Sequence, residues 1–153
     1  MFETLVTKIK GIDEVREGFK RHPRFSVQVM DQTVKKTALM LVESIKRNTP
    51  VKTSALKTSI RADFSPLRAI IAPHQPYALY VHEGTGIYGK SGQRIRPKTK
   101  KALYWKGALH PVKSVRGQKP QPFMERGYQE ARDNIQREFD IAVSKIINNL
   151  KGK

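Results

Sequence analysis

A long stretch from Gly84 to Met124 most limits the folds that this chain can adopt. The stretch is rich in Gly and Pro and contains no Asp or Glu. Gly and Pro at this density favour turns and extended backbone over helix. We therefore expect long, partly mobile loops around one or two short strands, and we expect the residues on either side to present them. This stretch is called the basic loop below.

The basic loop concentrates the positive charge of the chain. The formal net charge is +17, and ten of the 30 Lys and Arg residues lie in the loop. These ten are Lys90, Arg94, Arg96, Lys98, Lys100, Lys101, Lys106, Lys113, Arg116 and Lys119. Like charges in such number repel one another, so an interaction role is favoured over a merely solvated charge run. Nucleic acid is the first candidate partner, and an acidic protein surface is the second.

The overall composition excludes several classes of protein. A chain of 153 residues is most simply one domain, residues 1–153, and 38% apolar residues suffice for a folded core. The absence of Cys excludes disulfides, thiolate zinc sites and cysteine nucleophiles. No apolar run resembles a signal peptide or reaches the eighteen residues of a membrane span, so we expect a soluble protein with no membrane partner.

Two stretches show apolar residues spaced by threes and fours, which is typical of amphipathic helices. The first runs from about Arg24 to Asn48, where Pro50 disfavours helical backbone at the residue before it. The second runs to Leu150 from Pro122, which is a favourable first helical residue. We expect two long helices over these ranges.

A different period lies between the first helix and the basic loop. Residues from Leu56 to Phe64 alternate between apolar and polar, which predicts a half-buried strand. A Ser-Pro turn then leads to a partner strand over Leu67–Ala72, so an antiparallel hairpin should pack one face on the first helix. Tyr77 to Val81, followed by Gly84, predicts a short helical turn that ends at glycine.

Three weaker patterns complete the prediction. Thr4–Lys10 is rich in β-branched residues and suggests a strand, and Asp13 can cap a short helix that ends at His22. Within the basic loop, Ala102–Trp105 is the best strand candidate. The fold class is therefore α+β, with the long N-terminal-half helix and the long C-terminal helix packed on a small antiparallel sheet, plus a long basic loop region.

A metal-dependent nuclease is the sharpest enzymatic hypothesis for a small basic protein, because metal ions need closely placed carboxylates. Asp63 and Glu83 are the available pair. Thr85 stands where a Lys would usually orient the attacking water, and no second acid is nearby. We therefore disfavour the nuclease hypothesis. We expect that the protein is not an enzyme and has no catalytic residues.

Other site motifs are also missing. The four histidines, His22, His74, His82 and His110, lack the spacing of metal ligands, so no metal site is expected. His82 and Glu83 are adjacent, but adjacent side chains point in different directions, which argues against an acid/base pair. The glycines after Glu83 match neither the Walker nor the GxGxxG spacing, so no cofactor is expected.

Three aromatic residues lie among the cations of the basic loop. Tyr88, Tyr104 and Trp105 could stack on nucleic-acid bases where basic and aromatic residues mix. Alternatively, Tyr104 and Trp105 belong to a strand and face a core. We favour the second interpretation for these two because an apolar ALYW cluster buries well.

Three segments together resemble the phage family of head–tail joining, or tail-completion, proteins. The segments are TPVKTSALKTSI (residues 49–60), YALYVHEGTG (77–86) and QPFMERGY (121–128), and they occur in the family's order. Matching positions are Thr49, Pro50, Val51, Thr53, Leu56, Tyr77, Ala78, Tyr80, Val81, Gly84, Thr85, Pro122 and Phe123. Two departures are Ser54, where the family usually has glycine for a positive φ, and His82, where it usually has an acid that here follows as Glu83.

The resemblance implies a non-enzymatic subunit of a ring, most simply a hexamer, between the capsid connector and the tail tube. Connector and tail tube proteins would be its partners, and its place would be the virion, after assembly in the host cytoplasm. The matching positions would be structural or interface residues. Lys90, Arg94, Arg96, Lys98, Lys100 and Lys101 would contact either DNA in the channel or an acidic partner. The alternative is a non-specific DNA-binding protein that uses the same loop.

Overall fold

The computed structural model describes residue 20, residues 23–51 and residues 54–150. The predicted strand Thr4–Lys10, the short helix from Asp13 and the motif residue Thr53 lie outside this part of the chain. The described elements follow in the order α2 (Pro23–Asn48), α3 (Ala55–Thr58), β1 (Ile60–Ser65), β2 (Arg68–Pro73), α4 (Ala78–Glu83), the 3-10 helix η1 (Gly86–Tyr88) and α5 (Phe123–Leu150). The α+β class and both long helices are confirmed, with α5 beginning one residue after Pro122.

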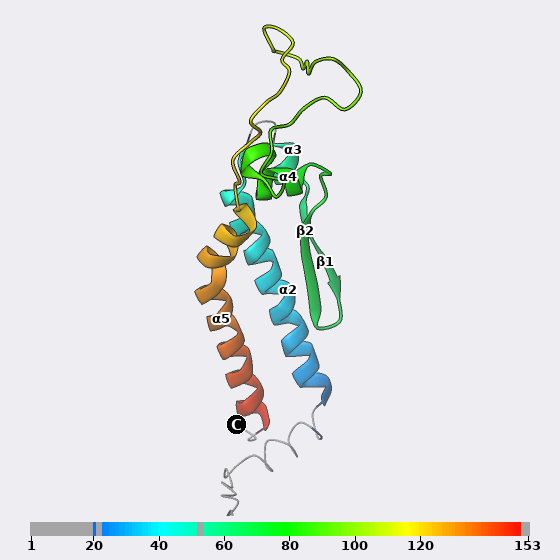
Figure 1. Cartoon of the computed structure of the whole chain (residues 1–153). Helices are drawn as coiled ribbons and strands as arrows, with labels where there is room; N and C mark the ends of the chain where they lie inside the picture. The colour runs from blue at the N-terminus through cyan, green and yellow to red at the C-terminus, as the bar shows by residue number, and fades with distance from the viewer. Residues whose placement is uncertain (1–19, 21–22, 52–53, 151–153) are drawn as a thin grey trace, which may run out of the picture.

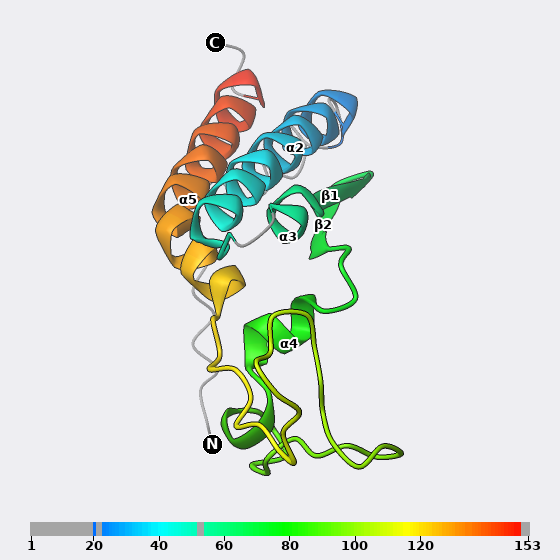
Figure 2. The same ribbon diagram turned by 90° about the horizontal axis from the view of Figure 1, so that it is seen from above.

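Helix α2 is the central element, because it contacts both α5 and the hairpin. Figure 1 shows α2 and α5 side by side and antiparallel, and Figure 2 shows α5, α2 and the hairpin in that order. The basic loop projects beyond the end of the helix pair where α2 ends and α5 begins (Figure 1). None of the helices among the described residues has the length and apolar character needed to span a membrane.

The two long helices approach to backbone contact near Gly127. A Cβ on Gly127 would lie 2.5 Å from the Cα of Ile45, so only glycine fits there. The hydroxyl of Ser44 donates to the carbonyl oxygen of Gly127 across the same interface (2.9 Å). The main core surrounds this contact and consists of Val42, Ile45, Leu56, Ile60, Ala78 and Phe123.

The hairpin is confirmed and is attached to α2 on one face. Strand β1 pairs antiparallel with β2, and Ala62 lies opposite Ile71 on the face that packs against the core. The backbone N–H of Leu67, in the turn, donates to Oδ1 of Asp31 on α2 (3.0 Å). Leu67 adopts a positive φ of 57°, which tightens the turn.

The strand predicted over Leu56–Phe64 is wrong in its first half. Leu56 and Thr58 belong to α3, and the strand begins only at Ile60. The N–H of Thr58 donates to the carbonyl oxygen of Ser54 (2.9 Å), closing a helical turn that places Leu56 in the core. Alternating apolar residues fit this turn as well as a strand, because Leu56 and Ile60 lie one helical turn apart.

Two further predictions from the apolar pattern are wrong. Ala102–Trp105 forms no strand, and its β-type pairing is limited to an isolated bridge between Leu103 and Val112. The apolar spacing of the second long helix includes Tyr128 and Val143 and predicts that they are buried, but each is about half exposed. The α2–α5 interface is lined instead by small residues of α5, including Ala131 and Ala142, which let the helices approach closely.

Candidate functional site

The basic loop leaves the body through a stem in which its two ends are hydrogen-bonded together. The N–H of Thr85 donates to the carbonyl oxygen of Gln118 (2.9 Å), and the N–H of Ile87 donates to that of Arg116 (2.8 Å). The N–H of Gln118 also donates to the side-chain hydroxyl of Thr85 (2.9 Å). These bonds join residues 29 and 33 positions apart in the sequence and hold the base of the loop in one arrangement.

Two glycines make this close approach possible. A Cβ on Gly86 would lie 2.1 Å from the carbonyl oxygen of Arg116, and one on Gly117 would lie 2.1 Å from that of Thr85. Both glycines also have a positive φ, +64° and +95°. The Gly-rich composition predicted turns here. It did not reveal that Gly86 packs against the backbone of Arg116, or that Gly117 packs against the backbone of Thr85.

The stem is anchored where the three family segments meet. Leu56, Ala78 and Phe123, one from each segment, belong to the same core cluster. The His82 ring packs edge-on against the Phe123 ring, with centroids 5.3 Å apart. Nε2 of His82 also lies 2.5 Å from a carboxylate oxygen of Glu125. The tertiary structure thus joins α4 to the first turn of α5, directly beneath the loop.

The remaining motif residues divide into buried and exposed groups. The hydroxyl of Thr49 donates to the carbonyl oxygen of Ile45 (2.7 Å) at the C-terminal end of α2. Ser54 has φ of 56°, so the serine adopts the positive φ that the family's glycine would favour. Val51 and Tyr80 are each 60% exposed and therefore do not stabilise the core of this chain.

Beyond the stem, the loop is an irregular ribbon with few backbone contacts. Ile95 and Val115 exchange two backbone hydrogen bonds (2.9 and 3.0 Å), and Leu103 and Val112 exchange two more (2.8 and 3.0 Å). Each pair is a single rung rather than a strand. The ribbon consequently extends away from the body without packing on it (Figure 1).

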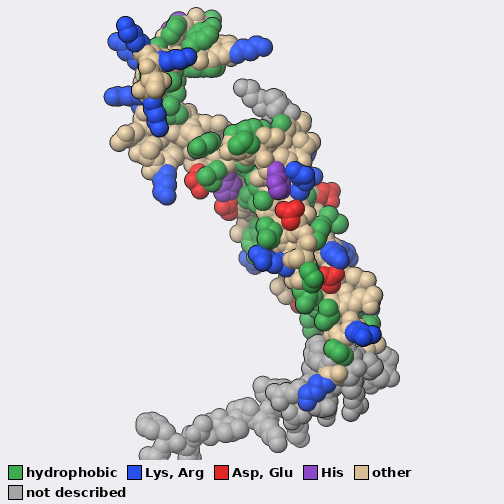
Figure 3. All heavy atoms as spheres, turned by 90° about the vertical axis from the view of Figure 1, so that its right-hand side faces the viewer, with side chains coloured by type: hydrophobic (Ala, Val, Ile, Leu, Met, Phe, Trp, Pro, Cys, Tyr) green, Lys and Arg blue, Asp and Glu red, His purple; other side chains and the backbone are tan. Residues whose placement is uncertain are grey.

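All ten cations of the loop are exposed, including Lys90, Arg94, Arg96, Lys98, Lys100 and Lys101. None of the salt bridges among the described residues involves a loop cation. Arg94 donates from Nε to the Ser114 hydroxyl (2.9 Å), and Nζ of Lys119 lies 5.9 Å from the centre of the Tyr88 ring. Figure 3 shows the resulting group of Lys and Arg side chains on the projecting loop.

The far end of the loop is apolar as well as basic. Tyr104 is 69% exposed, Trp105 51% and Leu109 99%. The interpretation of Tyr104 and Trp105 as core-facing strand residues is therefore wrong. The N–H of Ala108 donates to the carbonyl oxygen of Trp105 (3.0 Å), so a tight turn presents these side chains. Tyr104, Trp105 and Leu109 are called the apolar tip below.

The candidate nuclease carboxylates belong to separate elements with different neighbours. Asp63 lies on β1, and its carboxylate is 3.8 Å from Nε2 of His74. Glu83 ends α4 and lines a small groove with Leu79 and Tyr80 at the base of the loop. No cluster of three or more His, Asp or Glu side chains that could hold a metal ion occurs within the described residues.

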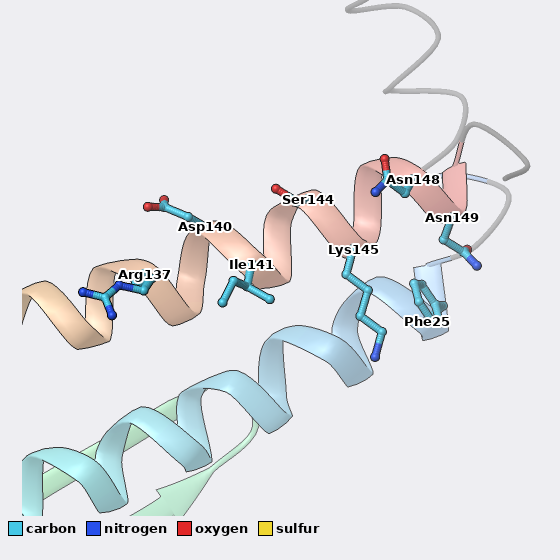
Figure 4. Close-up of a pocket in the computed structure, with 8 residues that line it drawn as sticks. All are labelled: Phe25, Arg137, Asp140, Ile141, Ser144, Lys145, Asn148 and Asn149. Atoms are coloured by element: carbon cyan, nitrogen blue, oxygen red, sulfur yellow. The ribbon is translucent and has the colours of Figure 1, made fainter.

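A larger hollow of about 810 Å³ lies at the opposite end of the helix pair from the loop. Figure 4 shows that Lys145 extends towards α2, whereas Asp140 points away from it. Asp140 accepts a hydrogen bond from Gln136 on its own helix (3.0 Å). The polar groups of this hollow do not converge on one point, so we assign no ligand to it.

The fold and its exposed loop define a small α+β protein that presents an extended, acid-free basic loop from a compact helical body. Residues 13–84 match the family model described as "Bacteriophage HK97-gp10, putative tail-component". Over these residues, which make up just under half of the chain, the protein is similar to this family of phage tail components, and this similarity confirms the resemblance found in the sequence. A tail component is part of the virion.

The family match ends at Gly84, where the stem of the basic loop begins. It includes α2, α3, the hairpin and α4, but neither the loop nor α5. No curated protein and no solved structure matches the chain. The family match therefore covers α2, α3, the hairpin and α4 of the body and does not bear on the role of the basic loop.

Proposed function

We propose that this tail component is a non-enzymatic ring subunit that joins or terminates the tail at the head–tail junction. The observation that carries the proposal is the convergence of the three family segments into one core, directly beneath a projecting basic loop. Such a subunit acts through shape and charge, and no chemical turnover is required of it.

Exposed motif residues support an interface in the ring. Val51 and Tyr80 belong to the family segments, yet each is 60% exposed in the single chain. Residues that match a family pattern without filling the core are available for contacts between subunits. A closed ring needs a heterologous interface, in which different faces of two copies meet, and the resemblance favours six copies.

The basic loop then contacts either DNA in the channel or an acidic neighbouring protein. Contacts from Lys and Arg to phosphates are independent of base sequence, which suits a conduit for any DNA. The same charges can guide docking on an acidic protein surface. Both uses fit cations that have no carboxylate partner within the described residues.

Deletion of the gene from the phage genome tests the joining role. We expect filled heads and separate tails to accumulate, and we expect the wild-type chain, supplied from a plasmid, to restore complete virions. Electron microscopy measures joined particles, and sedimentation measures whether the purified protein forms a ring alone or only on particles. Normal joined virions without the gene product would contradict the proposal.

A second candidate is a non-specific DNA-binding protein, favoured by the ten exposed loop cations. Binding to free duplex DNA should then be tight at low salt and should weaken steeply as salt rises, because released counterions drive the association. A salt series with a duplex of random sequence measures this. Tight duplex binding by a monomer or dimer, with no affinity for heads or tails, would favour this candidate over the joining role.

A further inference from the structure

The apolar tip exposes large apolar side chains, and a role in electrostatic contacts alone does not explain why they are there. Tyr104, Trp105 and Leu109 are large apolar side chains held in solvent at the end of a projecting ribbon. Figure 3 shows hydrophobic side chains among the Lys and Arg side chains at the end of the loop. Aromatic residues ringed by polar groups are typical of the few residues that contribute most of the free energy of a protein–protein contact.

The sign of the partner's charge follows from the surrounding cations. Lys98, Lys100, Lys101, Lys106 and Lys113 flank the tip in the sequence, and the loop holds no Asp or Glu. A neighbouring surface of positive or neutral charge would leave these ammonium groups repelling one another. We therefore expect the surface that receives the tip to be acidic.

We propose that the apolar tip is an anchor that inserts into an apolar recess on an acidic surface of an adjoining virion protein. The proposal rests on the joining role proposed above and names the chemistry of one partner. The cations guide the tip to the acidic surface, and burial of Tyr104, Trp105 and Leu109 then slows its release.

Neither duplex DNA nor a second copy of the chain fits the tip as well. Phosphate contacts use the cations but offer no recess for Leu109, and stacking on aromatic rings needs unpaired bases, which an intact duplex does not present. The chain outside the loop is itself net positive, with 20 Lys and Arg against 13 Asp and Glu. A second copy therefore lacks the complementary charge.

The stem prepares the loop for this role. The backbone bonds from Thr85 to Gln118 and from Ile87 to Arg116 restrain its base before any partner is present. Restraint in the free protein lowers the conformational entropy lost on docking. The tip can therefore reach a partner at a distance from the body, while the stem holds the loop in a fixed orientation relative to the body.

Trp105 is the only tryptophan of the chain, so its fluorescence reports directly on the tip. The test uses the full-length protein with three probes: tails and DNA-filled heads purified from the gene-deletion phage, and free duplex DNA. The tip variant combines Tyr104→Ser with Leu109→Ser and keeps Trp105 as the reporter. The control is Leu39→Ser, which removes an exposed apolar side chain from α2 (58% exposed).

We expect one of the two particles to shift Trp105 emission to shorter wavelength with saturation, and the shift to weaken as salt rises. The tip variant should bind that particle at least about tenfold more weakly, whereas Leu39→Ser should bind like the wild type. Equal binding by the tip variant overturns the proposal, as does an equal shift with duplex DNA or tip-dependent self-association. Wild-type protein that binds neither particle would instead contradict the joining role itself.

Discussion

Gly127 of α5 lies against the backbone of Ile45 in α2, at a separation where an added Cβ would be 2.5 Å from the Ile45 Cα. The contact sets the spacing of the helix pair beneath the basic loop. It also places the Gly127 carbonyl oxygen within hydrogen-bond distance of the Ser44 hydroxyl (2.9 Å). A residue that weakens an isolated helix is thus required by the tertiary structure.

Gly127→Ala should destabilise the protein, although alanine favours an isolated helix by about 1 kcal/mol. The methyl group forces α2 and α5 apart, and we expect a net loss of about 1–3 kcal/mol in the free energy of unfolding. Chemical denaturation measures this change. The control is Ser144→Ala on the exposed face of α5, which should change stability by no more than about 0.5 kcal/mol. Unchanged or increased stability of Gly127→Ala would contradict the packing.

Gly117→Ala should open the stem of the basic loop. The substitution combines a positive φ of +95° with a clash against the Thr85 carbonyl oxygen. Gly92→Ala is the matched control, because Gly92 has a φ of +62° but no atom within 4 Å of an added Cβ. We expect the amide protons of Ile87 and Gln118 to exchange with solvent faster in Gly117→Ala, while Gly92→Ala leaves them protected. Exchange by NMR distinguishes the two, and equal protection in both variants would argue against a clamped stem.

Replacing Ser54 with glycine should stabilise the body. Ser54 has a φ of 56°, and glycine adopts this region without the steric cost of a Cβ, so a gain of about 1 kcal/mol is expected. Ala55→Gly is the control, because Ala55 begins α3 and glycine there should be destabilising or neutral. Thermal unfolding measures both. A lower melting temperature for Ser54→Gly would show that the serine side chain has a stabilising role of its own.

Removal of six positive charges from the basic loop should weaken binding to heads or tails without changing the stability of the fold. Changing Lys90, Arg94, Arg96, Lys98, Lys100 and Lys101 to Gln leaves the core untouched, because all six side chains are exposed. We expect stability to change by no more than about 0.5 kcal/mol for each residue, with a marked loss of binding to heads or tails. If a side chain contacts duplex DNA, its removal should lower the slope of log affinity against log salt by about 0.9. Unaltered binding in the sixfold variant would contradict the contact role of these residues.

Acidification should weaken the packing between α2 and α5. Hydrogen bonds from Arg47 and from Asn48 hold the pKa of Glu130 below its ordinary value near 4.5. Because the folded-state pKa is lowered, the stabilisation is present above the unfolded-state pKa and is lost as pH falls through the folded-state value. Glu130→Gln should therefore flatten the decrease in stability below about pH 4.5.

Denaturation curves across a pH series measure this effect. Asp133→Asn is the control, because Asp133 is largely exposed and contacts only the neighbouring Arg132 (3.5 Å). This variant should keep the wild-type pH dependence below pH 4.5. An identical acid profile for wild type and Glu130→Gln would show that the contacts from Arg47 and Asn48 add nothing to stability.

Elements that depend on local chemistry were predictable from the sequence. Pro50 ends α2 two residues after Asn48, and Pro122 immediately precedes the first residue of α5. The Ser-Pro turn yields the antiparallel hairpin, and Gly84 ends α4 with a φ of 80°. Proline and glycine restrict or extend the backbone at their own positions, so these boundaries do not depend on the rest of the fold.

Features that depend on distant residues were not predictable. The alternation around Leu56 suited a strand, but contacts with the core favoured the helical turn of α3. The apolar ALYW segment suggested a buried strand, yet no surface of the body lies near enough to cover Tyr104 or Trp105. A local pattern shows which side chains are apolar, whereas their burial depends on what lies opposite.

The sequence by itself determined the α+β class, the two long helices and the acid-free positive charge of the basic loop. Periodicity and proline placement act on the nearby backbone, and net charge is a sum over residues, so none of these features depends on the tertiary structure. Only the tertiary structure decided that Gly127 must face Ile45, that Gly86 and Gly117 clamp the stem, and that the apolar tip stays in solvent. Each of these depends on the distance between segments far apart in the chain. Such distances are set by the packing of the whole molecule.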